Sequence, residues 1–297
     1  MPDEQITGKL GQLELGDRFP VRVMGAINLT ANSFYGGSVH LSVEEVVQTA
    51  LKMETEGADI IDLGARSTAP YRTSEISIEM EERLLTEAIH ALSGKLDVPL
   101  SVDTTRLVPA VAAFRLGVRI LNDVYGLTQE GASELASLVS TSAGSMVLTA
   151  HEMRSSTDPI QPIERISHCL QKGLELVARS GIPKERICID PGIGFFSDSR
   201  LSNVEWNCNV LSELQKLRTF GLPICIGLSR KKFLGTILGD LPPESRLVGS
   251  LSATGIAVYN GAHLIRTHDI KETVEAVKVA QAIREKGLMA GMHQGSN

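Results

Sequence analysis

Short apolar runs rich in valine and isoleucine recur along the chain, and segments of helical periodicity separate them. Continuous apolar runs of this length are typical of strands buried on both faces of a parallel sheet. The predicted strands cover residues 21–29, 59–64, 98–104, 119–125, 145–150, 187–193, 223–228 and 263–268.

Between these runs, apolar residues recur at spacings of three and four, which is the period of an amphipathic helix. The predicted helices cover residues 43–56, 78–92, 108–116, 133–140, 164–180, 205–219, 247–259 and 270–285. Strands that alternate with helices in this way predict an α/β protein, and eight such units favour a single-domain (β/α)8 TIM barrel. An open, doubly wound sheet is the alternative.

The length of 297 residues fits one such barrel, whose usual size is about 250 residues, and no Pro/Ser-rich linker divides the chain. We expect an N-terminal extension over residues 1–18, the catalytic barrel over 19–288 and a flexible tail over 289–297. The start of the chain has no secretory signal pattern and no stretch of eighteen apolar residues occurs, so we expect a cytoplasmic protein without a membrane partner.

Charge and motifs narrow the class of ligand. The formal net charge is −6 and lysine and arginine do not cluster, which argues against nucleic-acid binding and favours a small molecule. No helix opens with a glycine-rich dinucleotide or P-loop motif, which argues against NAD and ATP. The four cysteines, Cys169, Cys188, Cys208 and Cys225, lack Cys-x-x-Cys spacing and are expected to be reduced core thiols.

Polar residues follow the predicted strands, and barrel enzymes carry their chemistry at the carboxyl ends of strands. The segment Ser229-Arg230-Lys231 directly follows the apolar run 223–228 and carries a hydroxyl and two cations. The other strand ends carry Asn28 and Thr30, Arg66 and Thr68, Asp103 to Thr105, Asn122 and Asp123, His151, Asp190, and Arg266 to Asp269. For Asp123 and Asp269 alone, a structural role as a strand or helix cap is the favoured interpretation.

Three of these polar residues, Asp103, Asn122 and Asp190, interrupt otherwise apolar runs. Burying such a group unpaired costs about 1 to 3 kcal/mol, and more for a carboxylate, so a ligand or neighbour must satisfy it. Two carboxylates and a carboxamide suit a flat heterocycle with alternating donors and acceptors, such as a 2-amino-4-oxo ring.

A second group of strand-end residues supplies positive charge and hydrogen-bond donors. Lys231, Arg266 and His268 suit an anionic leaving group.

Six segments in order resemble the signature of the dihydropteroate synthase family. They are Met24-Gly-Ala-Ile-Asn-Leu-Thr-Ala-Asn-Ser-Phe34, Ser101-Val-Asp-Thr104, Leu121-Asn-Asp123, Asp190-Pro-Gly-Ile-Gly-Phe195, Ser229-Arg-Lys-Lys-Phe-Leu-Gly235 and Arg266-Thr-His-Asp269. The resemblance spans nearly the whole chain and implies a TIM barrel. It also implies Mg²⁺-dependent condensation of 6-hydroxymethyl-7,8-dihydropterin pyrophosphate with para-aminobenzoate in folate biosynthesis, in which pyrophosphate leaves before the amine attacks.

The resemblance assigns roles residue by residue. The residues it places on the pterin are Thr68, Asp103, Asn122, Asp190 and Lys231. Those it places on the aminobenzoate are Phe195 and Ser229, with the stem of Lys231. Those it places on the pyrophosphate are Asn28, Arg266 and His268, and Asn28 also binds Mg²⁺. The implied catalytic set is Asn28, Lys231, Arg266 and His268.

The chain departs from the family pattern in three loops. The second-strand loop usually reads Glu-Ser-Thr-Arg-Pro but here reads Arg-Ser-Thr-Ala-Pro, so Ala69 replaces an arginine, and we hypothesise that Arg66 or Arg72 supplies the missing charge. The first loop carries Ala31 in place of proline and an asparagine in place of aspartate. The family is a sulfonamide target, but Phe196 here replaces a glycine in a pattern similar to synthases that discriminate against these drugs.

An extra residue near His151 makes its alignment uncertain, so His151 is not assigned to the catalytic set. A methyltetrahydrofolate corrinoid methyltransferase would share the pterin positions, but it has no pyrophosphate to release and does not require the cationic group. A catalytically silent pterin-binding barrel is a further alternative. The resemblance implies a homodimer, through the last two helices, and the acceptor is either para-aminobenzoate or a derivative of it.

Overall fold

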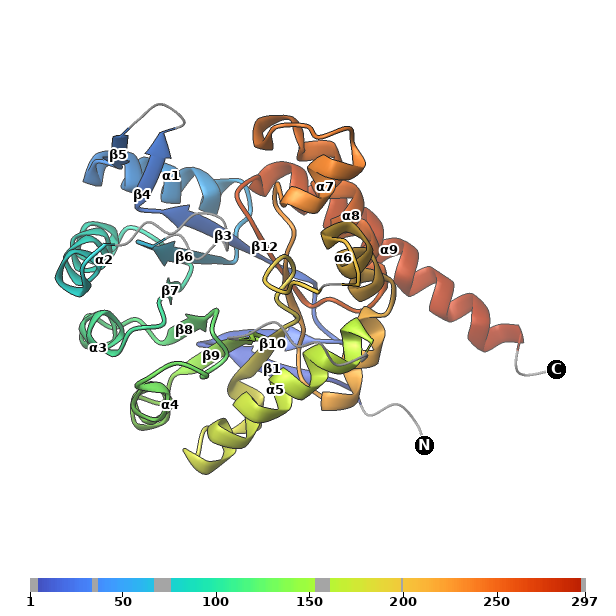
Figure 1. The fold of residues 1–297 in the computed structure, drawn as a ribbon, viewed down its shortest axis with the longest axis horizontal. Helices are drawn as coiled ribbons and strands as arrows, with labels where there is room; N and C mark the ends of the chain where they lie inside the picture. Colours follow the sequence, from blue (N-terminus) through green and yellow to red (C-terminus); the bar gives the residue numbers. More distant parts are fainter. Residues whose placement is uncertain (1–4, 34–36, 67–75, 153–160, 199, 295–297) are drawn as a thin grey trace.

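A ring of eight parallel strands forms the centre of the molecule (Figure 1). The structure is a computed structural model that describes residues 5–33, 37–66, 76–152, 161–198 and 200–294. In ring order the strands are β10 (Ile187–Asp190), β9 (Ser145–Thr149), β8 (Ile120–Asp123), β7 (Leu100–Asp103), β6 (Ile60–Gly64), β3 (Arg22–Asn28), β12 (Leu264–Thr267) and β11 (Cys225–Gly227). A parallel bridge between Ile189 and Ile224 joins the two ends of this order. The barrel predicted from the alternating pattern is therefore confirmed.

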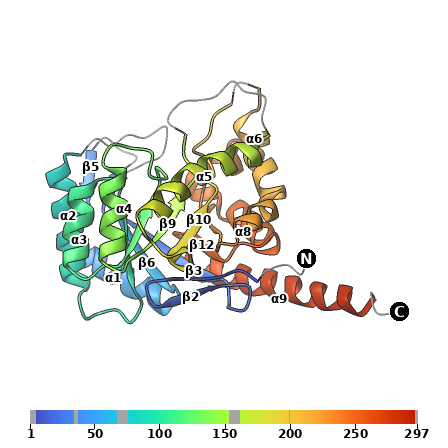
Figure 2. The same ribbon diagram turned by 90° about the horizontal axis from the view of Figure 1, so that it is seen from below.

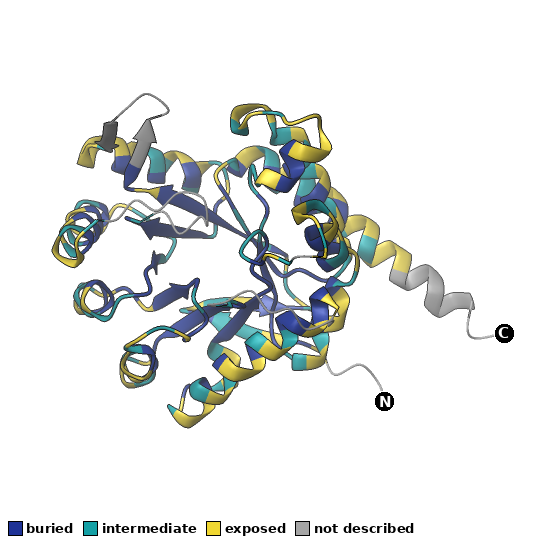
Figure 3. Cartoon of the chain, in the orientation of Figure 1, coloured by how far each residue is buried: buried dark blue, intermediate teal, exposed yellow. Residues whose placement is uncertain are grey.

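Helices cover the outside of the barrel (Figure 1). They are α1 (Val43–Thr55), α2 (Ile78–Leu92), α3 (Leu107–Arg115), α4 (Ala132–Thr141), α5 (Pro162–Arg179), α6 (Asn203–Ser212), α7 (Lys232–Ile237), α8 (Leu247–Tyr259) and α9 (Ile270–Gln294). Local sequence fixes several starts: Ser42 and Glu45 form a capping box on α1, which satisfies backbone N–H groups that a helix leaves unpaired. The outer faces of the helices are exposed, whereas the strands and inner faces are buried (Figure 3).

Apart from shifts of one or two residues at their ends, the helices differ from the predicted ranges in three places. The helix expected to reach residue 219 ends at Ser212, and a 3-10 helix, η2 (Leu214–Phe220), takes over. The short helix α7 was not predicted, because six residues carry too little periodicity to detect. Helix α9 continues past residue 285 to Gln294. None of the helices in the described ranges is long and apolar enough to cross a membrane.

Two β-hairpins flank the barrel and were absent from the sequence prediction. The first, β1 (Thr7–Leu10) with β2 (Leu13–Gly16), lies across the amino-terminal end of the strands (Figure 2). Its Leu10 and Leu15 are fully buried in the core cluster inside the barrel, against Met24 and other strand residues. This hairpin therefore closes the barrel at the end opposite the polar strand ends. The second, β4 (Thr30–Ser33) with β5 (Gly37–His40), follows β3.

The cysteines divide between the core and the surface. All four are free, as predicted, and Cys188 and Cys225 are buried inside the barrel. Cys208 is exposed on α6, so the prediction of a core thiol is wrong there. It failed because a cysteine in an amphipathic helix gives no indication of which face it occupies.

Candidate active site

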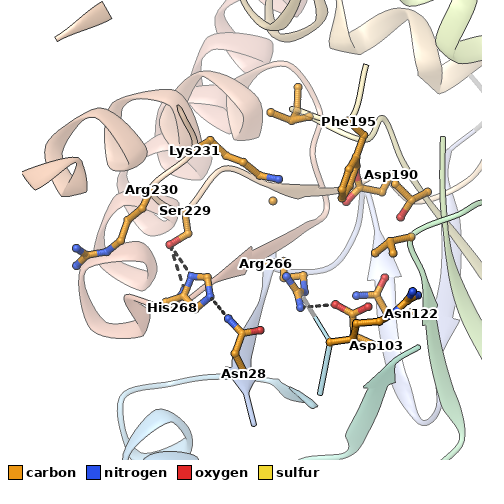
Figure 4. A pocket seen from close by; sticks show the side chains of 15 residues that line it. Asn28, Asp103, Asn122, Asp190, Phe195, Ser229, Arg230, Lys231, Arg266 and His268 are labelled. Atoms are coloured by element: carbon orange, nitrogen blue, oxygen red, sulfur yellow. Dashed lines mark hydrogen bonds and ion pairs between the residues drawn. The ribbon is translucent and has the colours of Figure 1, made fainter. Parts of the chain in front are cut away.

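A pocket lies at the carboxyl ends of the barrel strands, with side chains from most strands pointing into it (Figure 4). Its lining residues are Asn28, Arg66, Asp103, Asn122, Val124, Thr149, Asp190, Ile193, Phe195, Gly227, Ser229, Arg230, Lys231, Arg266 and His268. Every site residue proposed from the sequence is in this set except Thr68, which lies outside the described residues. Residues far apart in sequence are brought together by the closure of the barrel.

The floor of the pocket carries the buried acids and the amide. Asp103 and Asn122 are paired neighbours in the β7–β8 ladder, so their side chains project side by side into the barrel. Asp190, at the end of β10, accepts the Gly192 N–H through Oδ1 at 2.7 Å. Asp103 Oδ1 is buried and has no hydrogen-bond partner among the described residues. An acceptor without a partner in a pocket floor is suited to a ligand N–H group.

Asp62 is a site residue that the sequence analysis missed. It lies on β6 two residues before the strand end, on the same inner face as Gly64 and one layer deeper. Its fully buried Oδ2 accepts from Arg266 Nε at 2.7 Å and from Asn122 Nδ2 at 3.0 Å. Its signal in the sequence is a carboxylate inside the apolar run Ile-Ile-Asp-Leu-Gly, two residues before the strand end at which site residues were expected.

Arg266 is held by two carboxylates. Nε binds Asp62, and Nη2 donates to Asp103 Oδ2 at 2.8 Å. Burial works against the guanidinium charge, but Asp62 and Asp103 more than offset this effect and raise the pKa of Arg266. Burial raises the pKa of Asp103 to about 7, although the charge of Arg266 works against this shift. Asp103 therefore changes its charge close to neutral pH.

Lys231 reaches over the pocket from the end of the β11 loop. Its Nζ lies 4.9 Å from the ring centroid of Phe195, a cation–π distance. Burial lowers the pKa of Lys231 to about 8, although nearby Asp190 favours the charged form. The preceding residue, Arg230, has φ of 55° and points away from the pocket centre to pair with Asp269 at 2.6 Å (Figure 4). The Arg230–Asp269 pair thus fixes the turn that directs Lys231 inward.

Asn28, Ser229 and His268 form a third group beside Arg266 (Figure 4). His268 Nδ1 lies 3.1 Å from Ser229 Oγ, and His268 Nε2 lies 3.5 Å from Asn28 Nδ2. Burial by the surrounding protein lowers the pKa of His268 to about 4, and the positive charge of Arg266 adds to this shift. Part of the ring is nevertheless open to the pocket. The sequence analysis expected a cation at this position, whereas burial and then the charge of Arg266 favour the neutral form of His268.

The loops that depart from the family pattern are only partly described. Ala69 and Arg72 lie outside the described residues. Arg66 lines the pocket, donates from Nη2 to Thr105 Oγ1 at 2.6 Å, and lies with its guanidinium carbon 5.5 Å from the Tyr125 ring centroid. It therefore points toward the β7–β8 side of the pocket mouth, whereas Asn28 and its neighbours lie at β3 and β12.

Phe196 does not line the pocket. Its side chain is buried and stacks on Trp206 with ring centroids 5.4 Å apart. Phe196 therefore does not contact a ligand in the pocket directly, because the loop turns its neighbour Phe195 toward the pocket and Phe196 toward Trp206. Asp123 accepts from the N–H groups of Tyr125 and Leu127, which confirms its structural role as a turn cap.

The pocket combines three chemical features. It has unpaired acceptors on its floor, a lysine against an aromatic ring at one side, and neutral donors with one arginine at the other. Among the described residues, no three histidine, cysteine or acidic side chains are grouped in a way that would hold a metal ion. This combination can bind a flat donor-rich ring next to an anionic group.

Comparison with known proteins identifies the family. The family model described as pterin binding enzyme matches residues 24–268. The dihydropteroate synthase of Escherichia coli (strain K12) is 35% identical over 267 residues, which cover 88% of this chain and 90% of that protein.

Two solved structures show the same architecture. The Yersinia pestis dihydropteroate synthase in a sulfonamide drug complex has a TM-score of 0.83 and 32% identity, and the match covers 95% of this chain and 100% of that chain. The Xanthomonas albilineans dihydropteroate synthase in complex with 7,8-dihydropteroate has a TM-score of 0.77 and 31% identity, with coverage of 94% and 98%. The chain therefore belongs to the pterin binding enzymes and, within them, to the dihydropteroate synthase family.

Proposed function

We propose that this pocket condenses 6-hydroxymethyl-7,8-dihydropterin pyrophosphate with para-aminobenzoate and releases pyrophosphate. One observation carries the proposal: Lys231 stands between an acidic floor suited to the pterin and the Phe195 ring, so a single residue borders two adjoining subsites. A pterin methylene bound over the floor would then face an amine bound against Phe195. Dihydropteroate synthesis of this kind is the activity of the family, and the product complex of the related Xanthomonas enzyme supports it.

The acids bind the pterin in this proposal. Asp103 and Asp190 accept ring N–H groups, because each is buried and Asp103 Oδ1 has no partner within the described chain. Asn122 supplies an amide held in place by Asp62. Lys231 donates to a ring acceptor, and Thr68, which lies outside the described residues, keeps the pterin-binding role that the family resemblance implies.

Departure of pyrophosphate is assisted by Arg266, His268 and Asn28. Arg266 Nη1 makes no hydrogen bond within the described residues, so it is available to the anion while Nε and Nη2 hold the floor. His268 holds this group together, because its Nδ1 contacts Ser229 Oγ and its Nε2 faces Asn28 Nδ2 beside the proposed position of the anion. The carbon–oxygen bond to pyrophosphate breaks first, and the aniline nitrogen then attacks the resulting methylene cation. No enzyme nucleophile is needed.

Asn28 is the proposed protein ligand of Mg²⁺. Its Nδ2 faces His268, and Oδ1 has no hydrogen bond within the described residues and is free for a cation. Mg²⁺ at substrate phosphates usually takes one or two protein ligands and completes its octahedron with phosphate and water, so a single amide oxygen fits. When bound, Mg²⁺ would neutralise charge on the departing pyrophosphate.

The acceptor subsite is bordered by Phe195, Ser229 and the stem of Lys231. The related Yersinia enzyme binds a sulfonamide drug, and in this proposal a sulfonamide that mimics the acceptor occupies this subsite. Arg66 contributes a further cation to the mouth of the pocket on its β7–β8 side. The hypothesis that Arg66 or Arg72 replaces the missing loop arginine would be rejected by wild-type turnover in both Arg66→Ala and Arg72→Ala.

A second copy of the chain is the proposed partner. Helices α8 and α9 pack on each other and leave a shared apolar groove on the outside of the barrel, which includes Ile256, Tyr259, Val279 and Ile283. These four side chains are more than half exposed, which is unusual for a contiguous apolar set on a monomer.

The test is a pyrophosphate-release assay with the pterin pyrophosphate, Mg²⁺ and a panel of aminobenzoates. Release that depends on both substrates, with formation of the dihydropteroate product, is the expected result. Pterin binding by calorimetry without acceptor-dependent release would instead indicate a catalytically silent barrel. Methyl transfer from methyltetrahydrofolate would indicate the corrinoid alternative. A derivative that outperforms free para-aminobenzoate would redefine the acceptor.

A further inference from the structure

Five side chains form a continuous row along the pocket mouth, from the end of β6 to the end of β11. Arg66 lies over Tyr125, and the Tyr125 and His151 rings are 4.6 Å apart. The His151 and Phe195 rings meet edge to face at 6.2 Å, and Lys231 lies over Phe195. A cation therefore caps each end of a three-ring aromatic row, which consists of Tyr125, His151 and Phe195.

Two glycines bring the three rings together. Gly126 has φ of +60°, and a Cβ there would lie 2.3 Å from the Thr149 carbonyl oxygen. Gly192 has φ of +71°, and a Cβ there would lie 2.4 Å from the Ala150 carbonyl oxygen. Only glycine permits both this backbone conformation and this approach. The loops that carry Tyr125 and Phe195 thus lie directly against the end of β9, which is followed by His151.

The His151 ring is held by packing. Its Nδ1 is buried and has no hydrogen-bond partner among the described residues. Burial lowers the pKa of His151, so the ring is uncharged at neutral pH despite the nearby Glu152. An uncharged ring between two other rings fills space and orients its neighbours, and it does not contribute charge to the pocket.

We propose that His151 is a positioning residue for the acceptor subsite. Its ring packs against the Phe195 ring. Phe195 and Lys231 together form one side of the proposed aminobenzoate subsite. The proposal rests on the proposed function, because that function assigns Phe195 to the aminobenzoate. His151 itself is not in the pocket lining, so its effect reaches the substrate through Phe195.

The test compares His151→Ala with His151→Phe in the pyrophosphate-release assay. His151→Ala is expected to raise KM for para-aminobenzoate about fivefold, the scale of one lost aromatic pair. KM for the pterin pyrophosphate and kcat should stay within about twofold of wild type, because the ring touches neither the acidic floor nor the leaving group. His151→Phe keeps a ring in place and should restore the acceptor KM.

His90→Ala is the matched control, because His90 is exposed on α2 away from the pocket. If His151→Ala does not fold, Tyr125→Leu removes the next ring in the row and should raise the same KM. Unchanged acceptor KM, an equal rise for both substrates, or failure of His151→Phe to restore it would overturn the positioning role. A wild-type protein that releases no pyrophosphate would instead overturn the proposed function itself.

Discussion

At the scale of single residues, Asp62 is the most informative side chain, because it binds Asn122 and Arg266 at once. Asp62→Asn keeps the shape but removes the charge and one acceptor for N–H donors. The loss of a charge-assisted hydrogen bond costs about 1.5 to 3 kcal/mol, so kcat/KM for the pterin substrate should fall by about 10- to 100-fold. Steady-state kinetics checks this, with circular dichroism to confirm folding. A variant with unchanged kinetics would show that Asp62 does not position the floor.

The pH dependence of kcat/KM follows from two shifted groups. Asp103, with a pKa of about 7, must be ionised to accept a pterin N–H, so kcat/KM should fall as the pH drops below about 7. Lys231, with a pKa of about 8, loses its charge as the pH rises through that value, so kcat/KM should fall there as well. A bell-shaped profile of kcat/KM for the pterin substrate is expected. A flat profile between pH 6 and 9 would contradict both assignments, and Lys231→Arg should remove the basic limb only.

Polar residues that lie within buried apolar runs could be identified as site residues from the sequence. Asp103, Asn122 and Asp190 were identified because each interrupts an apolar run near a strand end, and the structure places all three in the pocket floor. The charge state of His268 could not be predicted in this way. It depends first on burial by the surrounding protein and then on the through-space proximity of Arg266, and no sequence pattern encodes either.

At the scale of elements, the hairpin β1–β2 is attached to the barrel through Asp17. This carboxylate accepts from both Nη atoms of Arg218, at 2.9 and 3.0 Å, and from the Ile6 N–H. His263 Nε2 lies 3.3 Å from Asp17, and His263 Nδ1 accepts the Ile224 N–H at 3.0 Å. His263 must therefore carry no proton on Nδ1, and so be neutral, to keep its hydrogen bond from the Ile224 N–H.

This arrangement makes stability depend on pH. Burial lowers the pKa of His263, although Asp17 works against the shift. A histidine whose pKa is lower in the folded state contributes stability that is present above its unfolded pKa of about 6.5 and is lost as the pH falls below it. Urea unfolding should therefore show that stability falls as the pH is lowered from 7.5 to 5.5, in part through this group. His263→Gln should reduce that loss and exposed His90→Gln should not, whereas equal pH slopes in both would contradict the role.

The predictability of an element depended on how distinct its pattern is. The range of α2 was predicted to the residue, because fifteen residues of strong periodicity follow the N-cap Ser77. The hairpins were missed because their four-residue strands are not continuous apolar runs, whereas barrel strands of the same length lie within such runs.

At the scale of the whole molecule, the barrel leaves the groove between α8 and α9 as its prominent apolar surface among the described residues. If two copies of the chain form a dimer through this groove, a charged side chain placed in the groove should prevent dimer formation. Ile256→Glu or Val279→Glu should convert a dimer into a folded monomer, as measured by sedimentation velocity. Val108→Glu, an exposed site on α3, is the matched control and should remain dimeric. A monomeric wild-type protein would rule out the dimer.

In the proposed function, the pocket around Lys231 performs the condensation. The most direct measurement is the rate of acceptor-dependent pyrophosphate release by wild type, Lys231→Ala and Lys232→Ala, with product measured in the same samples. Lys232 is the adjacent, exposed lysine and serves as the control for a lost charge. Lys231→Ala should stay folded and lose at least about 100-fold in rate, the scale on which removal of one group that stabilises charge acts, whereas Lys232→Ala should match wild type. Equal rates in all three proteins would contradict the account.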